Sequence, residues 1–409
     1  MRKLLVLRGA PGVGKTLWTN ENRLLIYTLS YDNIRMLYQS PIQTIYGKEA
    51  ISPKKNQTAD EALISILEER MKSGEFTVID GINSKSKTIA IYQALAVKYR
   101  YQMYIIDFTQ VPIKTAKYWN IHRSRRKQVR EGIIDEIYKD FENEKLPHNL
   151  NIIKPSELNK VYEAPIDLSG YKKVHHIGDV HGCYNVLSGA IKANGNLRDD
   201  EFYIFLGDYT DKGTKNLDVM KFLLSIKNNH NVVFCEGNHE RWMWNWANEI
   251  NEYTPEFEER TLPQISSLNK KDVRRLYRNM KECYWYKFYD KNVINTHGGI
   301  ATLPEHIDYI STEQLIHGVG FYSDLPCIAN TFANTTTKNT YQVFGHRNPD
   351  LLEVNPGNRT FYLEGAVDSG GHLRWLTLNK DGFHEKEYEN LFGASSHGCG
   401  MSRAILSRA

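Results

Sequence analysis

Short apolar runs alternate with longer stretches of helical periodicity through the N-terminal part of the chain. The runs that we expect to form strands are Lys3–Leu7, Leu25–Leu29, Thr77–Asp80 and Gln102–Phe108. The stretches that we expect to form helices are Asp60–Lys72, Ser86–Lys98, Ile113–Ser124 and Ile133–Asn143. Strands that alternate with helices favour a parallel sheet with helices on both faces, so this pattern predicts an α/β domain.

The rhythm breaks at Pro155, Pro165 and Gly170, and a second cycle of apolar runs follows. Its expected strands are Val174–Ile177, Phe202–Leu206, Val232–Cys235 and Val293–Thr296, and the charged segment Asn248–Lys281 is an expected helical insertion. We therefore expect a second α/β domain after a linker. The predicted boundaries are 1–155 for the first domain, 156–172 for the linker, 173–386 for the second domain and 387–409 for a C-terminal tail.

Composition adds little beyond an ordinary globular protein of two or three domains. The chain has 409 residues, 41% of them hydrophobic and 24% charged, with a net charge of +4. Its five cysteines form no CxxC pair, which is typical of a reduced, cytoplasmic protein. The apolar run at the N-terminus stops at Arg8, too short for a signal peptide, and we expect no membrane segment.

A complete phosphate loop follows the first expected strand. The segment Gly9–Thr16 reads GAPGVGKT and matches G-x-x-x-x-G-K-[ST]. Backbone amides at Gly9, Gly12 and Gly14 would face phosphates, Lys15 would contact the β- and γ-phosphates, and Thr16 would bind magnesium. The motif therefore predicts a site for ATP, or another nucleoside triphosphate, with Mg²⁺.

The second expected strand leads into Ser30-Tyr31-Asp32-Asn33-Ile34-Arg35. Asp32 and Arg35 are three residues apart, so a helix would place them on one face. They are either an acceptor-site pair or a helix-capping aspartate beside a surface arginine. Here the chain resembles the kinase domain of bacterial and phage polynucleotide 5′-kinases. The resemblance implies that Asp32 is the general base for a 5′-hydroxyl and that Arg35 binds the acceptor phosphate.

The same resemblance extends to the basic run Arg123–Arg130, which looks like the kinase lid. Trp119-Asn120-Ile121-His122-Arg123 is similar to the R-N-x-x-R of that family, with Trp119 in place of its first arginine. Arg123 is thus the expected lid cation, with Arg126 or Arg125 compensating. Asp80, at the end of the third strand, is a weaker candidate for magnesium or its water.

Beyond residue 173, potential metal ligands occur in ordered blocks that each follow an apolar run. The ligands are Asp179 and His181 in GDVHG, Asp208 in GDYTDKG, Asn238 in GNHE, His297 in THGG and His346 in FGHR. Carboxylate, imidazole and amide groups suit a pair of divalent cations, and this mixture does not demand zinc. We therefore expect two metals, with manganese as the first choice.

These blocks resemble the calcineurin-like metallophosphoesterases. The resemblance makes Asp208 the bridging ligand and His239 the general acid. Lys212 stands where that family has an arginine on the substrate phosphate, and Arg241 is either a helper for it or a solvated arginine. Asp368, in Asp368-Ser369-Gly370-Gly371, resembles the family's terminal D-T-G and is an expected supporting or substrate-contacting carboxylate.

In this order, the two halves resemble bacterial-type polynucleotide kinase–phosphatase, with catalytic groups Lys15, Asp32, Arg35, Arg123, His239 and Asp368. The resemblance implies an end-healing enzyme that phosphorylates 5′-hydroxyls and removes 3′-phosphates or 2′,3′-cyclic phosphates. Its partners would be nucleic-acid ends, RNA such as cleaved tRNA rather than DNA. No K-x-[DN]-G core follows residue 380, so we expect a separate ligase.

Two alternatives stay open. One is a protein serine/threonine phosphatase or dinucleoside-polyphosphate hydrolase with a regulatory nucleotide-binding domain. The other is an RNA-binding adaptor with vestigial sites. Trp242, Trp244 and Trp246 would stack on bases in an RNA-binding protein, although an aromatic core is the preferred interpretation.

Overall fold

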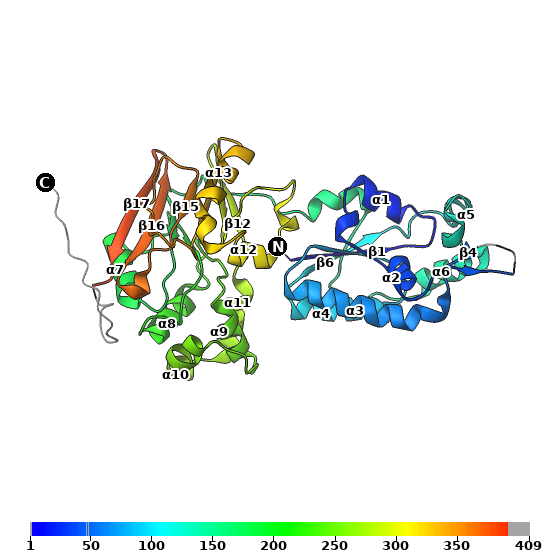
Figure 1. The fold of residues 1–409 in the computed structure, drawn as a ribbon, viewed down its shortest axis with the longest axis horizontal. Coiled ribbons are helices and arrows are strands. Elements are labelled where there is room, and N and C mark those ends of the chain that lie inside the picture. The colour runs from blue at the N-terminus through cyan, green and yellow to red at the C-terminus, as the bar shows by residue number, and fades with distance from the viewer. Residues whose placement is uncertain (1, 46, 48, 392–409) are drawn as a thin grey trace. The chain divides into compact units, whose positions relative to one another are not determined.

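The computed structural model describes residues 2–45, 47 and 49–391, which divide into two compact units (Figure 1). The first unit comprises the chain up to Ala164 together with Thr302–Leu315. The second unit comprises the remaining described residues from Pro165 onward. Among the described residues, no helix is long and apolar enough to cross a membrane.

A five-stranded parallel sheet forms the centre of the first unit, in the order β2-β5-β1-β6-β7. Its strands are β1 (Lys3–Arg8), β2 (Thr28–Ser30), β5 (Thr77–Asp80), β6 (Gln102–Asp107) and β7 (Asn151–Ile153). A separate two-stranded hairpin consists of β3 (Ile42–Gln43) and β4 (Glu49–Ala50). The buried strand β1 is apolar on both faces because helices cover both sides, as expected for a central parallel strand.

The helices of the first unit form the two outer layers, packed through two apolar clusters on opposite faces of the sheet. The α-helices are α1 (Lys15–Glu21), α2 (Tyr31–Tyr38), α3 (Asn56–Lys72), α4 (Ser86–Lys98), α5 (Ile113–Ile121) and α6 (Glu131–Asn143). Short 3₁₀ turns are η1 (Leu25–Tyr27), η2 (Pro53–Lys55), η3 (Arg125–Lys127) and η4 (Pro155–Lys160). The predicted α/β fold of this half is confirmed.

Two differences from the expected bounds and one additional strand have clear local origins or positions. The strand expected at Leu25–Leu29 begins only at Thr28, because Leu25–Tyr27 form a 3₁₀ turn. The helix expected to reach Ser124 ends at Ile121, where the amide of His122 bonds to the carbonyl of Trp119 in a tightened last turn. Strand β7 lies in a stretch where the sequence pattern gave no strand.

Residues Thr302–Leu315 pack within the first unit although they fall inside the sequence range predicted for the second domain, 173–386. Ile307 and Asp308 in this segment are each only 1% exposed. The ring of Tyr309 stacks on Tyr27 at a centroid distance of 4.6 Å and meets Phe76 edge-on at 5.0 Å. The first unit is therefore built from two separate pieces of sequence.

The second unit contains two five-stranded sheets. The first has the order β11-β10-β9-β16-β17, and the second has the order β15-β14-β13-β12-β8. The strands of the first sheet are β9 (Val174–Ile177), β10 (Phe202–Phe205), β11 (Val232–Phe234), β16 (His372–Asn379) and β17 (Gly382–Glu389). Those of the second are β8 (Ile166–Asp167), β12 (Tyr284–Phe288), β13 (Lys291–Asn295), β14 (Thr340–Phe344) and β15 (Thr360–Tyr362).

The two sheets pack face to face, because one buried cluster combines Ile204 and Leu376 of the first sheet with Tyr286 and Val293 of the second. A second cluster fills the space between the other face of the first sheet and the helices. The helices and turns of this half are α7 (Tyr184–Ala193), α8 (Asn216–Ile226), α9 (Glu240–Ala247), η5 (Phe257–Thr261), α10 (Leu262–Ile265), α11 (Lys270–Asn279), η7 (Tyr322–Asp324), α13 (Leu325–Thr335) and η8 (Val367–Ser369). The turn η6 (Ile307–Tyr309) lies in the first unit, and α12 (Thr312–His317) begins there and ends in the second.

The segments outside the two expected domains are partly structured. Strand β8 lies in the expected linker 156–172 and pairs with β12. Strand β17 continues to Glu389, so the expected tail 387–409 begins inside a strand. The rest of that tail from residue 392, including Cys399, lies outside the described residues.

Two candidate active sites

The ligand candidates of the second unit stand just past the ends of its parallel strands. Asp179 follows β9 and Asp208 follows β10 in the first sheet, and β9, β10 and β11 run parallel. His297 and His346 follow β13 and β14 in the second sheet, which also run parallel. Because the carboxyl ends of parallel strands share one edge, side chains from both sheets converge there.

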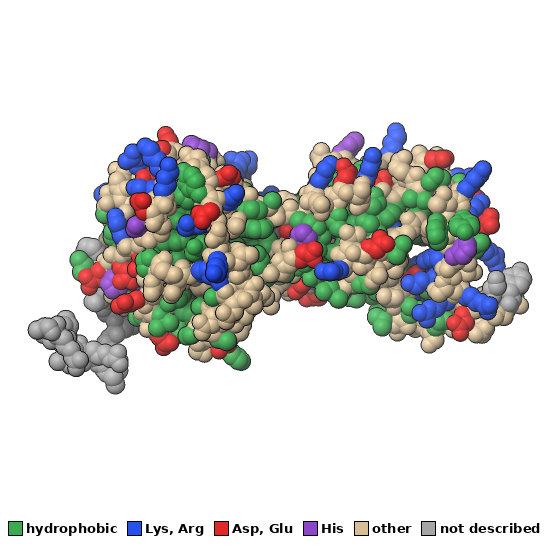
Figure 2. All heavy atoms as spheres, turned by 90° about the horizontal axis from the view of Figure 1, so that it is seen from above, with side chains coloured by type: hydrophobic (Ala, Val, Ile, Leu, Met, Phe, Trp, Pro, Cys, Tyr) green, Lys and Arg blue, Asp and Glu red, His purple; other side chains and the backbone are tan. Residues whose placement is uncertain are grey.

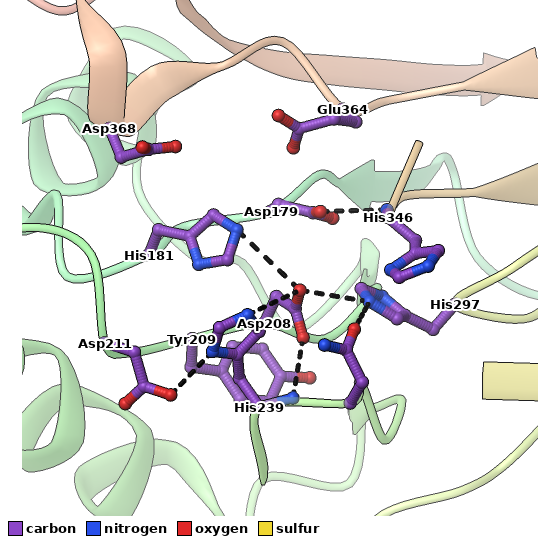
Figure 3. Close-up of polar contacts among 12 residues, drawn as sticks. Asp179, His181, Asp208, Tyr209, Asp211, His239, His297, His346, Glu364 and Asp368 are labelled. Carbon is purple, nitrogen blue, oxygen red and sulfur yellow. Dashed lines mark hydrogen bonds and ion pairs between the residues drawn. The ribbon is translucent and has the colours of Figure 1, made fainter. Parts of the chain in front are cut away.

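Asp208 lies at the centre of this cluster (Figure 3). Its Oδ2 atom is 3.2 Å from His297 Nε2, 3.7 Å from His181 Nε2 and 3.9 Å from His239 Nε2. Asn238 joins the same group because its Oδ1 atom is 3.1 Å from His297 Nε2. The expected ligands of the second half are thus together, and their roles as ligands stay predictions.

The backbone around the cluster is held in unusual conformations. His181, Asp208 and His346 have φ angles of 44°, 51° and 60°, in the left-handed region that non-glycine residues rarely adopt. At position 345, a Cβ atom would lie 1.9 Å from Asp179 Oδ1, so only glycine fits. Strain of this kind persists where the surrounding structure fixes it, and it is typical of functional sites.

Other groups orient the imidazoles and the Asp208 loop. The Nδ1 atoms of His181 and His297 lie 3.1 Å and 2.8 Å from the backbone carbonyls of Thr210 and Leu206. Donation from Nδ1 leaves both Nε2 atoms free to bind a cation. The buried carboxylate of Glu240 accepts the backbone amides of Asp208 (2.9 Å), Tyr209 (2.9 Å) and Gly237 (2.7 Å).

Burial and neighbouring charges shift the pKa values of Asp179 and Asp208 in opposite directions. Burial raises the pKa of Asp179 well above its usual value, and the nearby carboxylates of Glu364 and Asp208 raise it further. Burial also acts to raise the pKa of Asp208, but the imidazoles led by His297 outweigh it and hold this pKa well below normal. The cluster therefore gathers buried acidic groups whose charge calls for a compensating cation.

His239 forms a pair with Asp211. Its Nδ1 atom is 2.6 Å from Asp211 Oδ2, and the amide of His239 donates to Asp208 Oδ1 at 3.1 Å. Burial alone would lower the pKa of His239, but Asp208 and Asp211 outweigh it and raise the pKa to about 9. Such an imidazolium can donate a proton to an oxygen that leaves with a developing negative charge.

The donor set fits two divalent cations that share Asp208. Three groups of ligand atoms, each within 4.8 Å of one another, are His181–Asp208–His239, Asp208–His297–His346 and Asp179–His181–Glu364. Asp179 Oδ1 and Glu364 Oε2 are buried without a hydrogen-bond partner among the described residues. Bound divalent ions would supply Lewis acidity toward a phosphoester, and Asp208 would contribute to both positions.

Glu364 is the one member of these groups that the sequence analysis did not single out. It is 7% exposed, follows β15 by two residues and lies opposite Asp179 in Figure 3. An acidic residue directly after an apolar run, as in Leu363-Glu364-Gly365, was the available signal. Asp368, the residue expected from the D-T-G resemblance, lies at the edge of the cluster near His181 and accepts from Ser369 at 2.8 Å.

The two side chains expected to bind the substrate phosphate, Lys212 and Arg241, lie in different surroundings. Burial lowers the pKa of His181, Asp208 opposes this shift, and the positive charge of Lys212 adds to it. Arg241 is instead an exposed helix residue that lies 3.7 Å from Glu252 and 5.6 Å from the Trp242 ring centroid. This arrangement favours the solvated interpretation of Arg241.

Of the three tryptophans on α9, Trp246 is buried at 6% exposure. Trp244 stacks on Tyr277 at a centroid distance of 4.8 Å, and both Trp242 and Trp244 pack against the main core cluster. The preferred interpretation of these residues as aromatic core is confirmed.

The phosphate loop of the first unit links β1 to α1. Gly12 and Gly14 adopt φ angles of 87° and 93°, and Lys15 Nζ donates to the carbonyls of Gly9 (2.7 Å) and Ala10 (3.0 Å). A Cβ atom at position 12 would lie 2.2 Å from the carbonyl oxygen of Ala116, so helix α5 packs directly on this glycine. The loop is therefore preformed and open to a ligand at the start of α1.

A cavity of about 860 Å³ in the first unit contains most residues of the expected nucleotide and acceptor sites. The functional candidates that line it are Gly12, Gly14, Lys15, Thr16, Asp32, Arg35, Asp80, Arg123 and Arg126. Figure 2 shows a hollow in this unit with Lys and Arg side chains gathered around it. Gly9 and Arg125 are not among the lining residues, so Arg126 is the second lid cation that the structure favours.

Within this cavity the charged groups are paired. Arg35 Nη1 is 3.2 Å from Asp32 Oδ1, and Thr16 Oγ1 donates to Asp80 Oδ2 at 3.3 Å. Burial lowers the pKa of Lys15 to about 8, against the opposing effect of Asp80. Burial likewise lowers the pKa of Arg123, which interacts with Asp32 and Asp80. An anionic ligand here would meet a lysine and arginines that lack full solvation.

The residues gathered at the strand ends of the second unit could hold divalent cations, and comparison with known proteins places this half in a phosphoesterase family. A family model described as calcineurin-like phosphoesterase matches residues 172–377, about half of the chain. The chain therefore belongs to the calcineurin-like phosphoesterases. A model described as an AAA domain matches residues 4–143. This order matches the fused kinase–phosphatase architecture that the motifs resemble.

Individual relatives match part of the chain. The asymmetrical bis(5′-nucleosyl)-tetraphosphatase of Halalkalibacterium halodurans is 25% identical over 224 residues, which are 49% of this chain and 87% of the relative. Serine/threonine-protein phosphatase PP1-1 of Saccharomyces cerevisiae is 26% identical over 157 residues, 36% of this chain and 46% of that protein. A solved serine/threonine phosphatase from S. cerevisiae with similarity to human PP5 aligns with a TM-score of 0.40 and 15% identity, covering 57% of this chain and 85% of that one.

Proposed function

We propose that this phosphoesterase with a nucleotide-kinase-like domain heals broken nucleic-acid ends. In the first unit, the γ-phosphate of ATP passes to a 5′-hydroxyl. In the second unit, a 3′-phosphate is removed or a 2′,3′-cyclic phosphate is opened. The proposed substrates are RNA ends, such as those of cleaved tRNA, and a separate ligase then seals them.

The observation that carries the proposal is the cavity shared by Asp32 and the phosphate loop. Asp32 follows β2, and the loop follows β1, with β5 between them. Both nevertheless line one cavity, together with Arg35 and Arg123. A nucleotide-binding regulatory domain needs the phosphate loop but not a carboxylate and a guanidinium facing it. A kinase needs both, because an acceptor hydroxyl must be oriented and deprotonated.

In this reaction the cavity residues act as follows. Lys15 and the amides around Gly12 and Gly14 hold the donor phosphates, and Arg123 neutralises charge that develops on the transferred group. Asp32 accepts the proton of the 5′-hydroxyl, while Arg35 binds the phosphate of the acceptor strand. Magnesium bound near Thr16 and Asp80 would neutralise charge on the β- and γ-phosphates.

In the second unit, Asp179, His181, Asp208, Asn238, His297 and His346 would hold two divalent cations, with manganese proposed. The cations would provide the electrophilic and water-activating chemistry of a phosphoesterase. His239, oriented by Asp211, donates a proton to the leaving oxygen. Lys212 holds the phosphate as a point charge, without the bidentate fork of an arginine.

The kinase half is tested with labelled ATP and a 5′-hydroxyl oligoribonucleotide. Transfer to the 5′ end is expected, and Asp32→Asn should reduce it by at least about 100-fold, the lower range for loss of a general base. ATP affinity should stay within about twofold in this variant. Glu61→Gln, an exposed carboxylate on α3, is the matched control. Failure of the unmodified chain to label any 5′ end would refute the kinase proposal.

For the phosphatase half, the assay is release of phosphate from 3′-phosphate and 2′,3′-cyclic oligoribonucleotides with Mn²⁺. His181→Ala and Asp208→Ala should each abolish release while 5′-labelling continues. His384→Ala changes an exposed histidine on β17 and should retain activity. If a folded His181→Ala or Asp208→Ala protein lost both activities, the proposal of two independent sites would be wrong.

A second candidate function is hydrolysis of dinucleoside polyphosphates. It is favoured by the tetraphosphatase relative, because the aligned region includes 87% of that protein. The decisive comparison is kcat/KM on a dinucleoside tetraphosphate, a 3′-phosphate oligoribonucleotide and a phosphopeptide under one set of conditions. A preference of 100-fold or more for the dinucleotide would replace the end-healing proposal for the second unit.

A further inference from the structure

An exposed tryptophan lies at the cavity of the first unit without a role in the reaction described above. Trp119, on α5, is 55% exposed and lines the cavity together with Lys15 and Arg123. Its ring meets that of Tyr118 edge-on at 5.5 Å and lies 6.0 Å from that of His122. Single exposed aromatic residues are common on protein surfaces, so exposure alone says little. The position of this one beside the phosphate loop is informative.

The backbone of α5 is fixed against the phosphate loop. A Cβ atom on Gly12 would lie 2.2 Å from the Ala116 carbonyl oxygen and 2.9 Å from the Asn120 amide nitrogen. Trp119 is therefore held next to a loop that binds phosphates, at a fixed place on the helix. A flat aromatic side chain beside the phosphate loop can stack on the base of the nucleotide whose phosphates the loop binds.

The wall beside Trp119 is also held in place. The side chain of Asn120 is 2% exposed, and it bonds to both backbone groups of Val129, at 2.8 Å and 3.2 Å. These two bonds hold the basic run Arg123–Arg130 against α5 through Val129. Val129 lines the same cavity, so Trp119 and Val129 form an apolar part of its wall. A wall that is preformed binds a base with little loss of conformational entropy.

The order of the strands in the sheet indicates whether Trp119 and Val129 face the donor nucleotide or the acceptor. The phosphate loop follows β1, Asp32 follows β2 on the β5 side, and α5 follows β6 on the opposite side. In phosphoryl transfer the attacking and leaving oxygens are roughly in line across the phosphorus. An acceptor held by Asp32 therefore requires the leaving nucleoside diphosphate on the other side, toward β6 and α5. That side is where Trp119 lies.

We propose that Trp119 is the stacking surface for the base of the donor nucleoside triphosphate. This inference rests on the proposed kinase function, because it assumes a nucleoside triphosphate in the cavity and an acceptor held by Asp32. Stacking uses the face of a base and does not read its edges. The expected donor preference is therefore for purines over pyrimidines, with ATP and GTP bound within a few-fold of each other.

The test measures equilibrium binding to the full chain, with Mg²⁺ and without any acceptor. Trp119→Ala should weaken ATP binding about tenfold, within the range of base–aromatic stacking, and leave inorganic tripolyphosphate within about twofold. Trp119→Phe should restore most of the affinity for ATP. Ile121→Ala is the matched control, because Ile121 is 58% exposed on the same helix and does not line the cavity.

Several outcomes would overturn the proposal. Equal weakening of ATP and tripolyphosphate would mean that Trp119 only supports the loop. Unchanged ATP binding, with a raised KM for the 5′-hydroxyl oligonucleotide, would assign Trp119 to the acceptor.

Failure of this inference can be distinguished from failure of the end-healing proposal. If wild type binds ATP through Trp119 but labels no 5′ end, the inference is supported and the end-healing proposal fails. If the Trp119→Ala protein labels 5′ ends equally well at low ATP, the end-healing proposal is supported and the stacking inference fails.

Discussion

Removal of the Tyr309 ring tests whether the segment Thr302–Leu315 is an integral part of the first unit. This ring stacks on Tyr27 at 4.6 Å and meets Phe76 and Tyr162 edge-on at 5.0 Å and 5.8 Å. Its hydroxyl is 2.8 Å from that of Tyr162. Tyr309→Ala therefore removes a hydrogen bond, these three aromatic contacts and an edge-on contact with the His306 ring at 5.4 Å.

The magnitude follows from these contacts. The hydrogen bond contributes about 1 kcal/mol, and each aromatic pair adds roughly 0.5–1.5 kcal/mol. Replacement of a buried aromatic by alanine costs about 3–5 kcal/mol, and Tyr309 belongs at the lower end because it is only partly buried. We expect Tyr309→Ala to lower the free energy of unfolding of the first unit by about 3 kcal/mol. Tyr309→Phe should lower it by only about 1 kcal/mol.

Hydrogen exchange of the amides in β1 and β6 provides the assay, with amides of β9 and β10 as an internal reference. A loss of about 3 kcal/mol corresponds to roughly 100-fold faster exchange of the most protected amides, since ~1.4 kcal/mol is a factor of ten. Tyr38→Ala changes a tyrosine of the same unit that is 49% exposed, and should shift exchange by less than about threefold. If Tyr309→Ala matched that control, Thr302–Leu315 would not belong to the cooperative structure of this unit.

Three further predictions concern the second unit. Thr261 Oγ1 donates to Asp211 Oδ1 at 2.8 Å, so Thr261→Val should misplace His239 and lower phosphatase kcat about tenfold, part of the total effect of a general acid. KM should stay unchanged and Thr261→Ser should restore activity; a changed KM without a kcat effect would contradict this positioning role. Burial lowers the pKa of His176 from 6.5 to about 3, so the unfolded chain binds an extra proton between these values, and stability falls as pH falls through this window. His176→Gln should flatten the acid side of a urea-denaturation pH series by up to about 1.4 kcal/mol per pH unit, and parallel curves would exclude this contribution. Finally, Mn²⁺ at about 100 times its Kd should stabilise the protein by ~2.7 kcal/mol, and Asp179→Asn should remove most of this gain in a thermal scan; an equal gain in both proteins would place the cation elsewhere.

Most of the candidate functional residues could be predicted from the sequence because their motifs are local. The phosphate loop needs consecutive residues from Gly9 to Thr16, and a strand before a helix supplies the required geometry. The blocks of candidate metal ligands are equally local, since each candidate follows an apolar strand by two to four residues. Apolar runs therefore predicted most strands of the first unit, the strands β9, β10, β11 and β13 of the second, and the position of Asp179 and Asp208 just after strand ends.

The residues that sequence reasoning missed depend on contacts between distant segments. Glu364 has no motif of its own, and it joins the cluster only because β15 ends beside β14 and places its carboxylate opposite Asp179. Arg241 lies 3.7 Å from Glu252, which favours the solvated interpretation that the sequence analysis left open beside a phosphate-binding role. No local pattern could decide between the two interpretations, because the contact joins separate segments.

The division of the chain shows the same limit. Local patterning determined two α/β halves, a phosphate loop and an ordered set of metal ligands. Only the tertiary structure decided that Thr302–Leu315 leaves the second half to pack on Phe76 and Tyr27 of the first. It also decided that Asp32 and Trp119 line one cavity. The physical reason is that side-chain packing and strand order join residues far apart in the chain, and these are not encoded in any local period.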